Sequence, residues 1–200
     1  MAGGAPQAAA DATAADQAGA DRAATRRRRK ARAKAAGLGR SRGGLSSKIH
    51  AAVDSAGLPL AFVLTPGQAA DCPQFRTVLE KIRVPGSVGR PRTRPDAVAA
   101  DKAYSSKANR AYLRKRGIKA VIPEKRDQAA NRRKKGGRGG RPVSHDTELY
   151  KERNTVERCF QKVKTWRGVA TRYDKSPESF EAGLHLRGSI MWLKHLTSTT

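Results

Sequence analysis

The first 37 residues contain no Val, Ile, Leu, Phe, Tyr or Trp, so a hydrophobic core must come from the rest of the chain. A stretch without large apolar side chains cannot bury enough surface to offset the entropy of ordering it. We therefore predict a disordered, Ala-rich basic tail over residues 1–38 and one folded domain over residues 39–197. Within the tail, residues 21–36 are rich in Ala and Arg, which favours a helix once their charge is neutralised. The run 26–30 suits phosphate binding; the alternative is a solvated tail without a specific site.

The net charge indicates what kind of molecule the protein binds. The sequence has 42 Lys and Arg residues against 17 Asp and Glu, a formal charge of +25, which predicts a polyanionic partner, most simply nucleic acid. An anionic membrane surface is the rival, but no apolar run approaches the roughly 20 residues of a membrane span, and the start shows no secretory signal. The cysteines, Cys72 and Cys159, form no C-x-x-C pair, which fits a reducing compartment. We expect a cytoplasmic, nucleoid-associated protein.

From residue 39 onward, apolar runs alternate between strand and helix periods, which predicts an α/β domain with a mixed sheet. A β-hairpin is expected at 48–54 and 58–64, because Asp and Gly between two apolar runs are typical of a turn. A short buried strand at 97–100 ends at Asp101, and another strand covers 118–122.

Cap residues indicate where the helices of this domain begin. The predicted caps are Asp71, Ser105 or Ser106, Ser144 or Asp146, and Ser176. Residues 127–142 are predicted to form a basic loop, whose glycines let the backbone approach a phosphate closely.

The segment Tyr150–Lys164 has the 3.6-residue period of an α-helix. Its apolar stripe, suited to a core, consists of Leu149, Val156, Phe160 and Val163. A neighbouring sector carries Tyr150, Arg153, Glu157 and Lys164. A carboxylate, two cations and a phenol are thus expected to project side by side from the edge of the buried face. Taken alone, Glu157 is also explained by a salt bridge to Arg153 across one helical turn.

The spacing Tyr150-x2-Arg153-x3-Glu157-x6-Lys164 resembles the signature around the last acidic residue of DDE transposases of the insertion sequence four and five superfamily. The flanking motifs are similar to the insertion sequence five family: GRSRGGLSSKIHAAVD (39–54), LPLAFVLTPGQAAD (58–71), ADKAYSS (100–106), GIKAVIPEK (117–125) and WRGVATRYDK (166–175). The resemblance runs from about residue 39 to 196. It implies a ribonuclease-H-like fold of which the first strand, central in that fold, is missing, in a chain truncated at its N-terminus.

The resemblance implies metal-dependent DNA cleavage and strand transfer with two Mg²⁺ or Mn²⁺ ions. Such ions lie about 3.5–4 Å apart and serve the attacking and leaving oxygens, and carboxylate oxygens suit Mg²⁺. Asp101 and Glu157 match two of the family's acidic residues and are the expected metal ligands; a turn or cap role is the simpler alternative for Asp101. The family's first Asp ends an apolar strand, whereas the candidate here, Asp11, follows no strand. Asp54 and Asp71 are explained by turn and cap roles.

The same resemblance implies that Arg153 and Lys164 contact DNA phosphates beside the metal ions. Ion pairing on the helix surface is the simpler alternative for both, and Tyr150 either stacks on a base or packs. Further candidate phosphate contacts are Arg132, Arg133, Lys134 and Lys135. The expected partners are transposon ends and target DNA, bound by a homodimer. The alternative is a catalytically dead remnant that only binds DNA, because losing one metal ligand would lower catalysis by orders of magnitude.

Overall fold

The computed structural model describes residues 5–144 and 146–199, and the side chains of residues 17, 19–144 and 146–198. In chain order the elements are α1 (Ala5–Ala35), β1 (Gly39–Ser41), β2 (Gly44–Val53), β3 (Pro59–Pro66), α2 (Gln74–Glu80), β4 (Ala97–Ala99), η1 (Lys102–Tyr104), α3 (Lys107–Lys115), β5 (Lys119–Val121), α4 (Arg126–Lys134), η2 (Gly136–Gly139), α5 (Thr147–Lys151), α6 (Asn154–Lys164), α7 (Arg167–Thr171) and α8 (Pro177–Thr199), where η marks a 3₁₀ helix. The domain combines helices with strands, so the predicted α/β class is confirmed.

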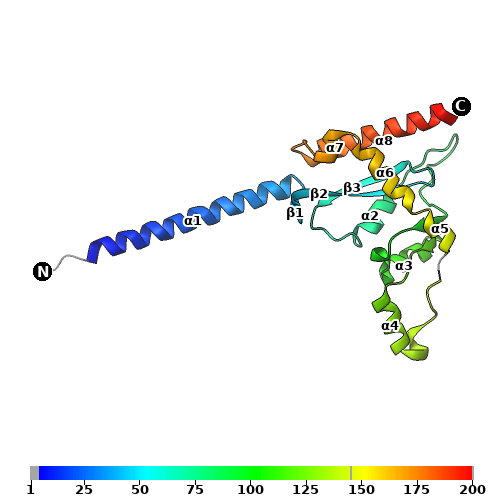
Figure 1. The fold of residues 1–200 in the computed structure, drawn as a ribbon, viewed down its shortest axis with the longest axis horizontal. Coiled ribbons are helices and arrows are strands. Elements are labelled where there is room, and N and C mark those ends of the chain that lie inside the picture. Colours follow the sequence, from blue (N-terminus) through cyan, green and yellow to red (C-terminus); the bar gives the residue numbers. More distant parts are fainter. Residues whose placement is uncertain (1–4, 145, 200) are drawn as a thin grey trace.

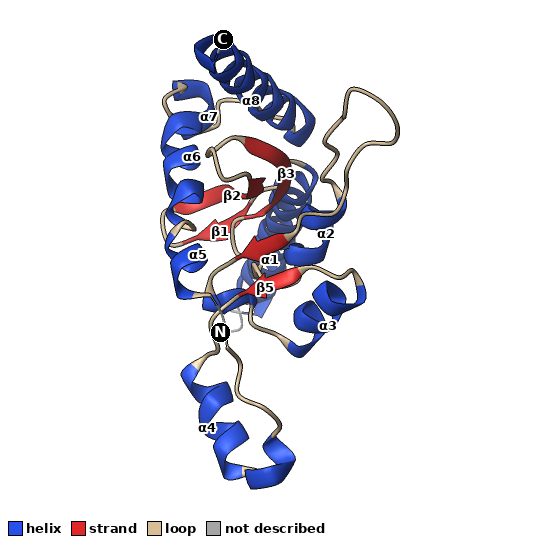
Figure 2. Cartoon of the chain, turned by 90° about the vertical axis from the view of Figure 1, so that its right-hand side faces the viewer, coloured by secondary structure: helices blue, strands red, loops and turns tan. Residues whose placement is uncertain are grey.

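The described strands form two sheets instead of the single mixed sheet that the sequence predicted. The expected hairpin is present as β2 and β3, which pair antiparallel, and β1 pairs with the start of β2. Strands β4 and β5 form a separate parallel pair. Figure 2 shows this pair, marked by β5, below the three antiparallel strands.

Local chemistry fixes several element ends as the sequence predicted. The hairpin turn is closed by Asp54, whose Oδ1 accepts a hydrogen bond from the Leu58 amide at 2.8 Å. Helix α3 begins after Ser106, whose Oγ accepts a hydrogen bond from the Asn109 amide at 3.1 Å. It ends before Gly117, which has a φ of +64°, a conformation that costs glycine little.

The antiparallel sheet is covered on both faces. Neighbouring residues of a strand point to opposite faces, and in β3 the side chain of Phe62 packs with α6, α7 and α8, whereas that of Ala61 packs with α2 and α3. Phe62 belongs to a buried cluster with Leu58, Cys159, Val163, Val169, Phe180, Leu184 and Met191. Ala61 belongs to a second cluster with Phe75, Leu79, Ile82, Leu113, Ile118 and Ile122. The second cluster extends to β5 and so connects the two sheets.

Helix α1 runs away from the rest of the molecule, and its first residue, Ala5, is at the far end (Figure 1). The sequence predicted disorder here, with a helix as the alternative on charge neutralisation. Ala and Arg are among the strongest helix formers, which accounts for the helical backbone although the helix lacks an apolar face. The candidate Asp11 lies in the part of α1 whose side chains are outside the described ones.

Three local predictions were wrong. Residues 127–142 are not a continuous loop, because α4 and η2 occupy most of them; Ala and Arg favour the helix here too. Asp71 does not cap α2, which begins after Pro73 without a side-chain cap; its carboxylate pairs with Lys48 instead. The helix expected over 150–164 is divided into α5 and α6, and at the junction the Val156 amide donates to Arg153 O, three residues back.

Candidate active site and basic surfaces

A cavity of about 320 Å³ lies between the two sheets, and Asp101 stands at its edge. The strands contribute residues 50–54 of β2 and the turn after it, and 97–101 of β4 and the residues after it. One wall comes from α2, with Phe75 and Val78, and the opposite wall from α5 and α6, with Leu149 and Val156. Arg153, between these two helices, lines the same cavity. The structure thus brings together Asp101 and Arg153, which the sequence placed in one site.

Asp101 is held by its own backbone turn. It precedes the 3₁₀ helix η1, and its Oδ1 accepts a hydrogen bond from the Lys102 amide at 2.7 Å. The cap role considered from the sequence is therefore present, and it engages one carboxylate oxygen. A ligand role and a cap role are compatible, because a carboxylate has about four acceptor positions.

Tyr104 lies near two carboxylates, those of Asp71 and Asp101. Burial raises the pKa of the Tyr104 hydroxyl to about 12, and the negative charges of Asp71 and Asp101, with Cys72, add to the rise. Its ring packs against Phe75, with ring centroids 5.6 Å apart. Sequence reasoning gave Asp71 a capping role and missed this proximity. The available signal was its position after β3, in the segment TPGQAAD.

Asp71 itself is part of a small polar cluster with His50 and Lys48. Its Oδ1 lies 3.1 Å from Lys48 Nζ and 3.6 Å from His50 Nδ1. His50 is buried, and its Nε2 is 2.8 Å from Thr65 Oγ1. Burial lowers the His50 pKa, against the opposing effect of Asp71. The imidazole is therefore neutral near pH 7, and Asp71 is balanced by Lys48.

Glu157 lies in the first turn of α6 with 63 % of its side chain exposed. Its Oε1 is 3.9 Å from Arg153 Nη1, the ion pair that the sequence offered as the simpler alternative. The Arg153 guanidinium also lies over the Tyr150 ring, 5.4 Å from its centroid. Tyr150, Arg153 and Glu157 are thus side by side, although they come from two helices.

Lys164 lies apart from this cluster. It is exposed at the end of α6 and lines a second cavity, of about 680 Å³, together with Lys48, Arg172 and Lys175. Arg172 ties this region to α1, because its Nη2 donates a hydrogen bond to Ala36 O at 2.5 Å. The sequence placed Lys164 beside Glu157, whereas the structure places it in a basic cleft next to the C-terminal end of α1.

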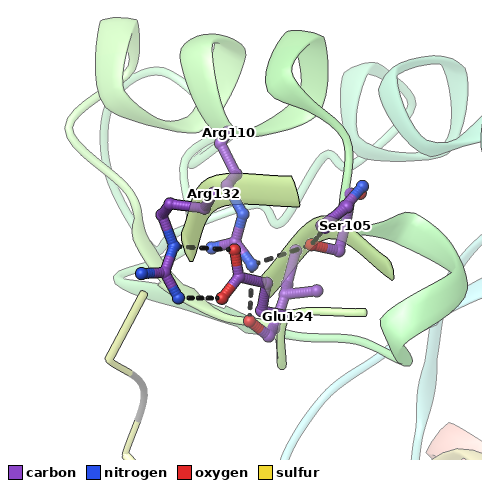
Figure 3. Close-up of polar contacts among 6 residues, drawn as sticks. Ser105, Arg110, Glu124 and Arg132 are labelled. Carbon is purple, nitrogen blue, oxygen red and sulfur yellow. Dashed lines mark hydrogen bonds and ion pairs between the residues drawn. The ribbon is translucent and has the colours of Figure 1, made fainter. Parts of the chain in front are cut away.

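The four residues of the predicted basic cluster differ in their surroundings: one forms a largely buried ion pair, and three are exposed. Arg132 binds Glu124 and is largely withdrawn from solvent, with 19 % of its side chain exposed. Next to this pair, Arg110 donates hydrogen bonds to Ser105 Oγ and to a backbone carbonyl (Figure 3). The other three cations, Arg133, Lys134 and Lys135, are exposed on and after α4. We call these three residues the basic arm; α4 points away from the two sheets in Figure 2.

The type of side chain found here suits a divalent cation, but the number of possible ligands placed together is too small. Carboxylate oxygens are the ligands that Mg²⁺ prefers. Asp101 lines the cavity, and Glu157 is exposed and pairs with Arg153, which lines it. However, among the side chains that the structure describes, no three His, Cys, Asp or Glu are placed to hold one metal ion. A further acidic ligand would have to come from outside these side chains or from a rearrangement.

These features define an α/β protein with carboxylates at a cavity edge and several basic surfaces, as expected of an enzyme acting on nucleic acid. The family model described as "Transposase DDE domain" matches residues 3–193. The chain therefore belongs to the DDE transposase domain family. The match includes residues 3–38, which the sequence motifs had left outside.

Two relatives agree with this assignment. The chain is 33 % identical over 150 residues to the putative transposase for insertion sequence element IS6501 of Brucella ovis, covering 75 % of this chain and 100 % of that protein. It is 31 % identical over 141 residues to the putative transposase for insertion sequence element IS402 of Burkholderia cepacia, covering 70 % of this chain and 59 % of that protein. No solved structure matches the chain. Within the described residues, every helix is too short or too polar to cross a membrane.

Proposed function

We propose that this chain is a catalytic domain that cleaves DNA at transposon ends and transfers the cut strand into target DNA. The observation that carries the proposal is the position of Arg153, which lines the cavity beside Asp101 and pairs with Glu157 at 3.9 Å. A phosphate bound by Arg153 would lie near both carboxylates that match the family's acidic residues. DNA is then the polyanion that the charge of +25 requires.

The arrangement of the elements supports a ribonuclease-H-like fold without its first strand. An antiparallel hairpin is followed by a helix, a parallel strand pair joined through α3, and further helices. In that fold the first strand would stand between the two sheets, which in this chain are separate.

In this proposal the protein's own side chains position the DNA. Arg153 and Lys164 hold phosphates on two sides of α6, and the basic arm binds the backbone further away. Asp101 and Glu157 would hold two Mg²⁺ or Mn²⁺ ions, which when bound activate the attacking oxygen and stabilise the leaving one. Tyr150 is held by Arg153 and would stack on a base only if that contact opened. A homodimer associated with the nucleoid is the expected working form.

A second function, DNA binding without catalysis, is favoured by one specific observation. The described side chains contain no group of three metal-binding residues. If no third carboxylate is supplied, the fold and the basic surfaces remain while the chemistry is lost. Such a chain would occupy transposon ends or join the oligomer of an intact relative.

The test is cleavage of a supercoiled plasmid and of a transposon-end duplex by the purified chain with Mg²⁺, Mn²⁺ or EDTA. We expect metal-dependent nicking that is lost in Asp101→Asn and Glu157→Gln. Glu148→Gln is the matched control, because Glu148 is an exposed carboxylate that pairs with Lys151. Salt-sensitive binding without nicking would favour the second function. Nicking that persists in both site variants, or no DNA binding at all, would contradict the catalytic proposal.

A further inference from the structure

Strand β4 presents one unpaired edge to the cavity between the sheets. The Ala100 amide donates to Val121 O at 3.2 Å, toward β5. Backbone groups of successive strand residues point to alternate sides, so those of Ala97 and Ala99 point away from β5. Both residues line the cavity. In the part of the chain that the structure describes, no strand pairs with this edge of β4.

Strand β2 presents a second unpaired edge to the same cavity. The Asp54 amide donates to Leu58 O at 3.0 Å, toward β3. By the same alternation, the backbone groups of Ala51 and Val53 point away from β3, and both residues line the cavity. Among the described strands, these two residues pair only with β3.

The opposite edge of the antiparallel sheet is protected in a way that these two edges are not. On β3, Pro59 and Pro66 have no amide hydrogen to offer. Trp192 Nε1 donates to Pro59 O at 2.9 Å, and Lys81 Nζ donates to Phe62 O at 3.2 Å. Proteins block edge strands with proline and side chains to prevent pairing with another chain. Ala51, Val53, Ala97 and Ala99 carry no such block.

The walls of the cavity suit a strand that is apolar on both faces. Phe75 and Val78 of α2 line one side, and Leu149 and Val156 line the other. A strand covered by helices on both faces is characteristically a continuous apolar run. An apolar small molecule could fill the volume but would leave the backbone donors and acceptors of both edges unpaired, which is costly in a buried place.

We propose that the cavity is a strand-acceptor site, in which an extended apolar segment of a second, longer transposase chain inserts between β2 and β4 and joins the two sheets. This mode is β-strand addition, with main-chain hydrogen bonds to both neighbours. Helix α1 does not fill the site, because it runs away from the sheets (Figure 1). The Burkholderia relative is a longer chain, since the match covers only 59 % of its length. Strand insertion at this site does not depend on catalysis.

The test uses overlapping synthetic peptides that cover the part of the Burkholderia transposase outside the match, titrated against the full chain. We expect binding by one segment that is apolar on both faces. Its N-methylated analogue, which keeps the apolar surface but loses amide donors along one edge, should bind about tenfold more weakly or worse, because at least two hydrogen bonds are lost. Equal binding of the analogue, or no binding by any peptide, would overturn the proposal.

Hydrogen exchange and one pair of variants locate the binding. The amides of Ala51, Val53, Ala97 and Ala99 should become protected when the peptide binds. Ala99→Pro removes an amide that points away from β5 and should weaken binding, whereas Ala99→Ser keeps the amide and should bind normally. Residue 98 already lies in a strand, the conformation that a following proline requires. Protection elsewhere, or equal affinity of the two variants, would contradict insertion at this edge.

Discussion

The guanidinium of Arg132 holds the carboxylate of Glu124 through two hydrogen bonds, from Nε at 3.2 Å and from Nη2 at 2.7 Å (Figure 3). Both side chains are largely withdrawn from solvent, with 19 % and 15 % exposed. Glu124 follows β5, and Arg132 lies in the last turn of α4. The pair therefore fixes the base of the helix that carries the basic arm, and Arg132 is not free to hold a phosphate while the pair is intact.

We predict that Glu124→Gln lowers the melting temperature at pH 7 and that the difference from the wild type shrinks as the pH falls below the ordinary pKa of a Glu side chain. The hydrogen bonds from Arg132 lower the Glu124 pKa below its ordinary value of 4.5. A lowered pKa in the folded state stabilises the protein above the ordinary pKa, and this contribution is lost as the pH falls through the folded-state value. Thermal unfolding followed by circular dichroism from pH 3 to 8 measures it.

The control for this measurement is Glu148→Gln. Glu148 also pairs with a cation, Lys151, but the side chains are 78 % and 72 % exposed. Exposed pairs contribute little, so this variant should melt close to the wild type at every pH. A Glu124→Gln difference that is constant down to pH 3 would show that the carboxylate charge is not what stabilises α4.

Replacing all three residues of the basic arm with Ala should weaken DNA binding and reduce its salt dependence. Each phosphate contact contributes about 0.9 to the slope of log K against log salt concentration, so loss of three contacts should reduce the slope by roughly 2.7. Fluorescence anisotropy with a labelled duplex at several salt concentrations gives the slope.

The matched control for the basic arm removes three exposed cations of α3, Lys107, Arg114 and Lys115, and so makes the same change in net charge. We expect a smaller change in slope for this control. Equal changes in both variants would show that total charge, and not the position of α4, determines the affinity.

The parts of the structure that the sequence predicted correctly are those with a local cause. The hairpin followed from the turn residues Asp54 and Gly57, and the start of α3 from Ser106. The end of β4 before Asp101 followed from a short apolar run. In each case a hydrogen bond or a dihedral preference within a few residues decides the result, and one sequence contains that information.

The parts that the sequence missed depend on contacts with residues outside the local segment. Asp71 pairs with Lys48 and lies near Tyr104, and its position after β3 does not identify either partner. Arg132 was grouped with its basic neighbours because its partner, Glu124, lies eight residues earlier, outside the basic run. The cavity exists because β2 and β4 do not pair with each other. The hydrophobic periodicity of each strand predicts the strand itself and does not show which strands pair.

We predict that one of the two thiols reacts at pH 8 in the native protein. Burial raises the Cys159 pKa to about 11, and its side chain is 1 % exposed, so almost no thiolate is available. Cys72 is partly exposed, with Asn109 Nδ2 at 3.4 Å from its sulfur. A colorimetric thiol assay should give one fast equivalent natively and two after unfolding. Cys72→Ser should remove the fast equivalent; two fast equivalents in the wild type would contradict burial of Cys159.

Arg153→Ala should weaken DNA binding several-fold and reduce the salt slope by about 0.9, because one phosphate contact is removed. The melting temperature should change little, since the pair with Glu157 has side chains 35 % and 63 % exposed. Arg158→Ala is the control, because Arg158 is an exposed cation of the same helix that does not line the cavity. Equal weakening by the two substitutions would remove Arg153 from the site, since only total charge would then matter. A selective loss in Arg153→Ala would instead place a phosphate at Arg153, in the cavity that Asp101 also lines, where the proposed chemistry requires it.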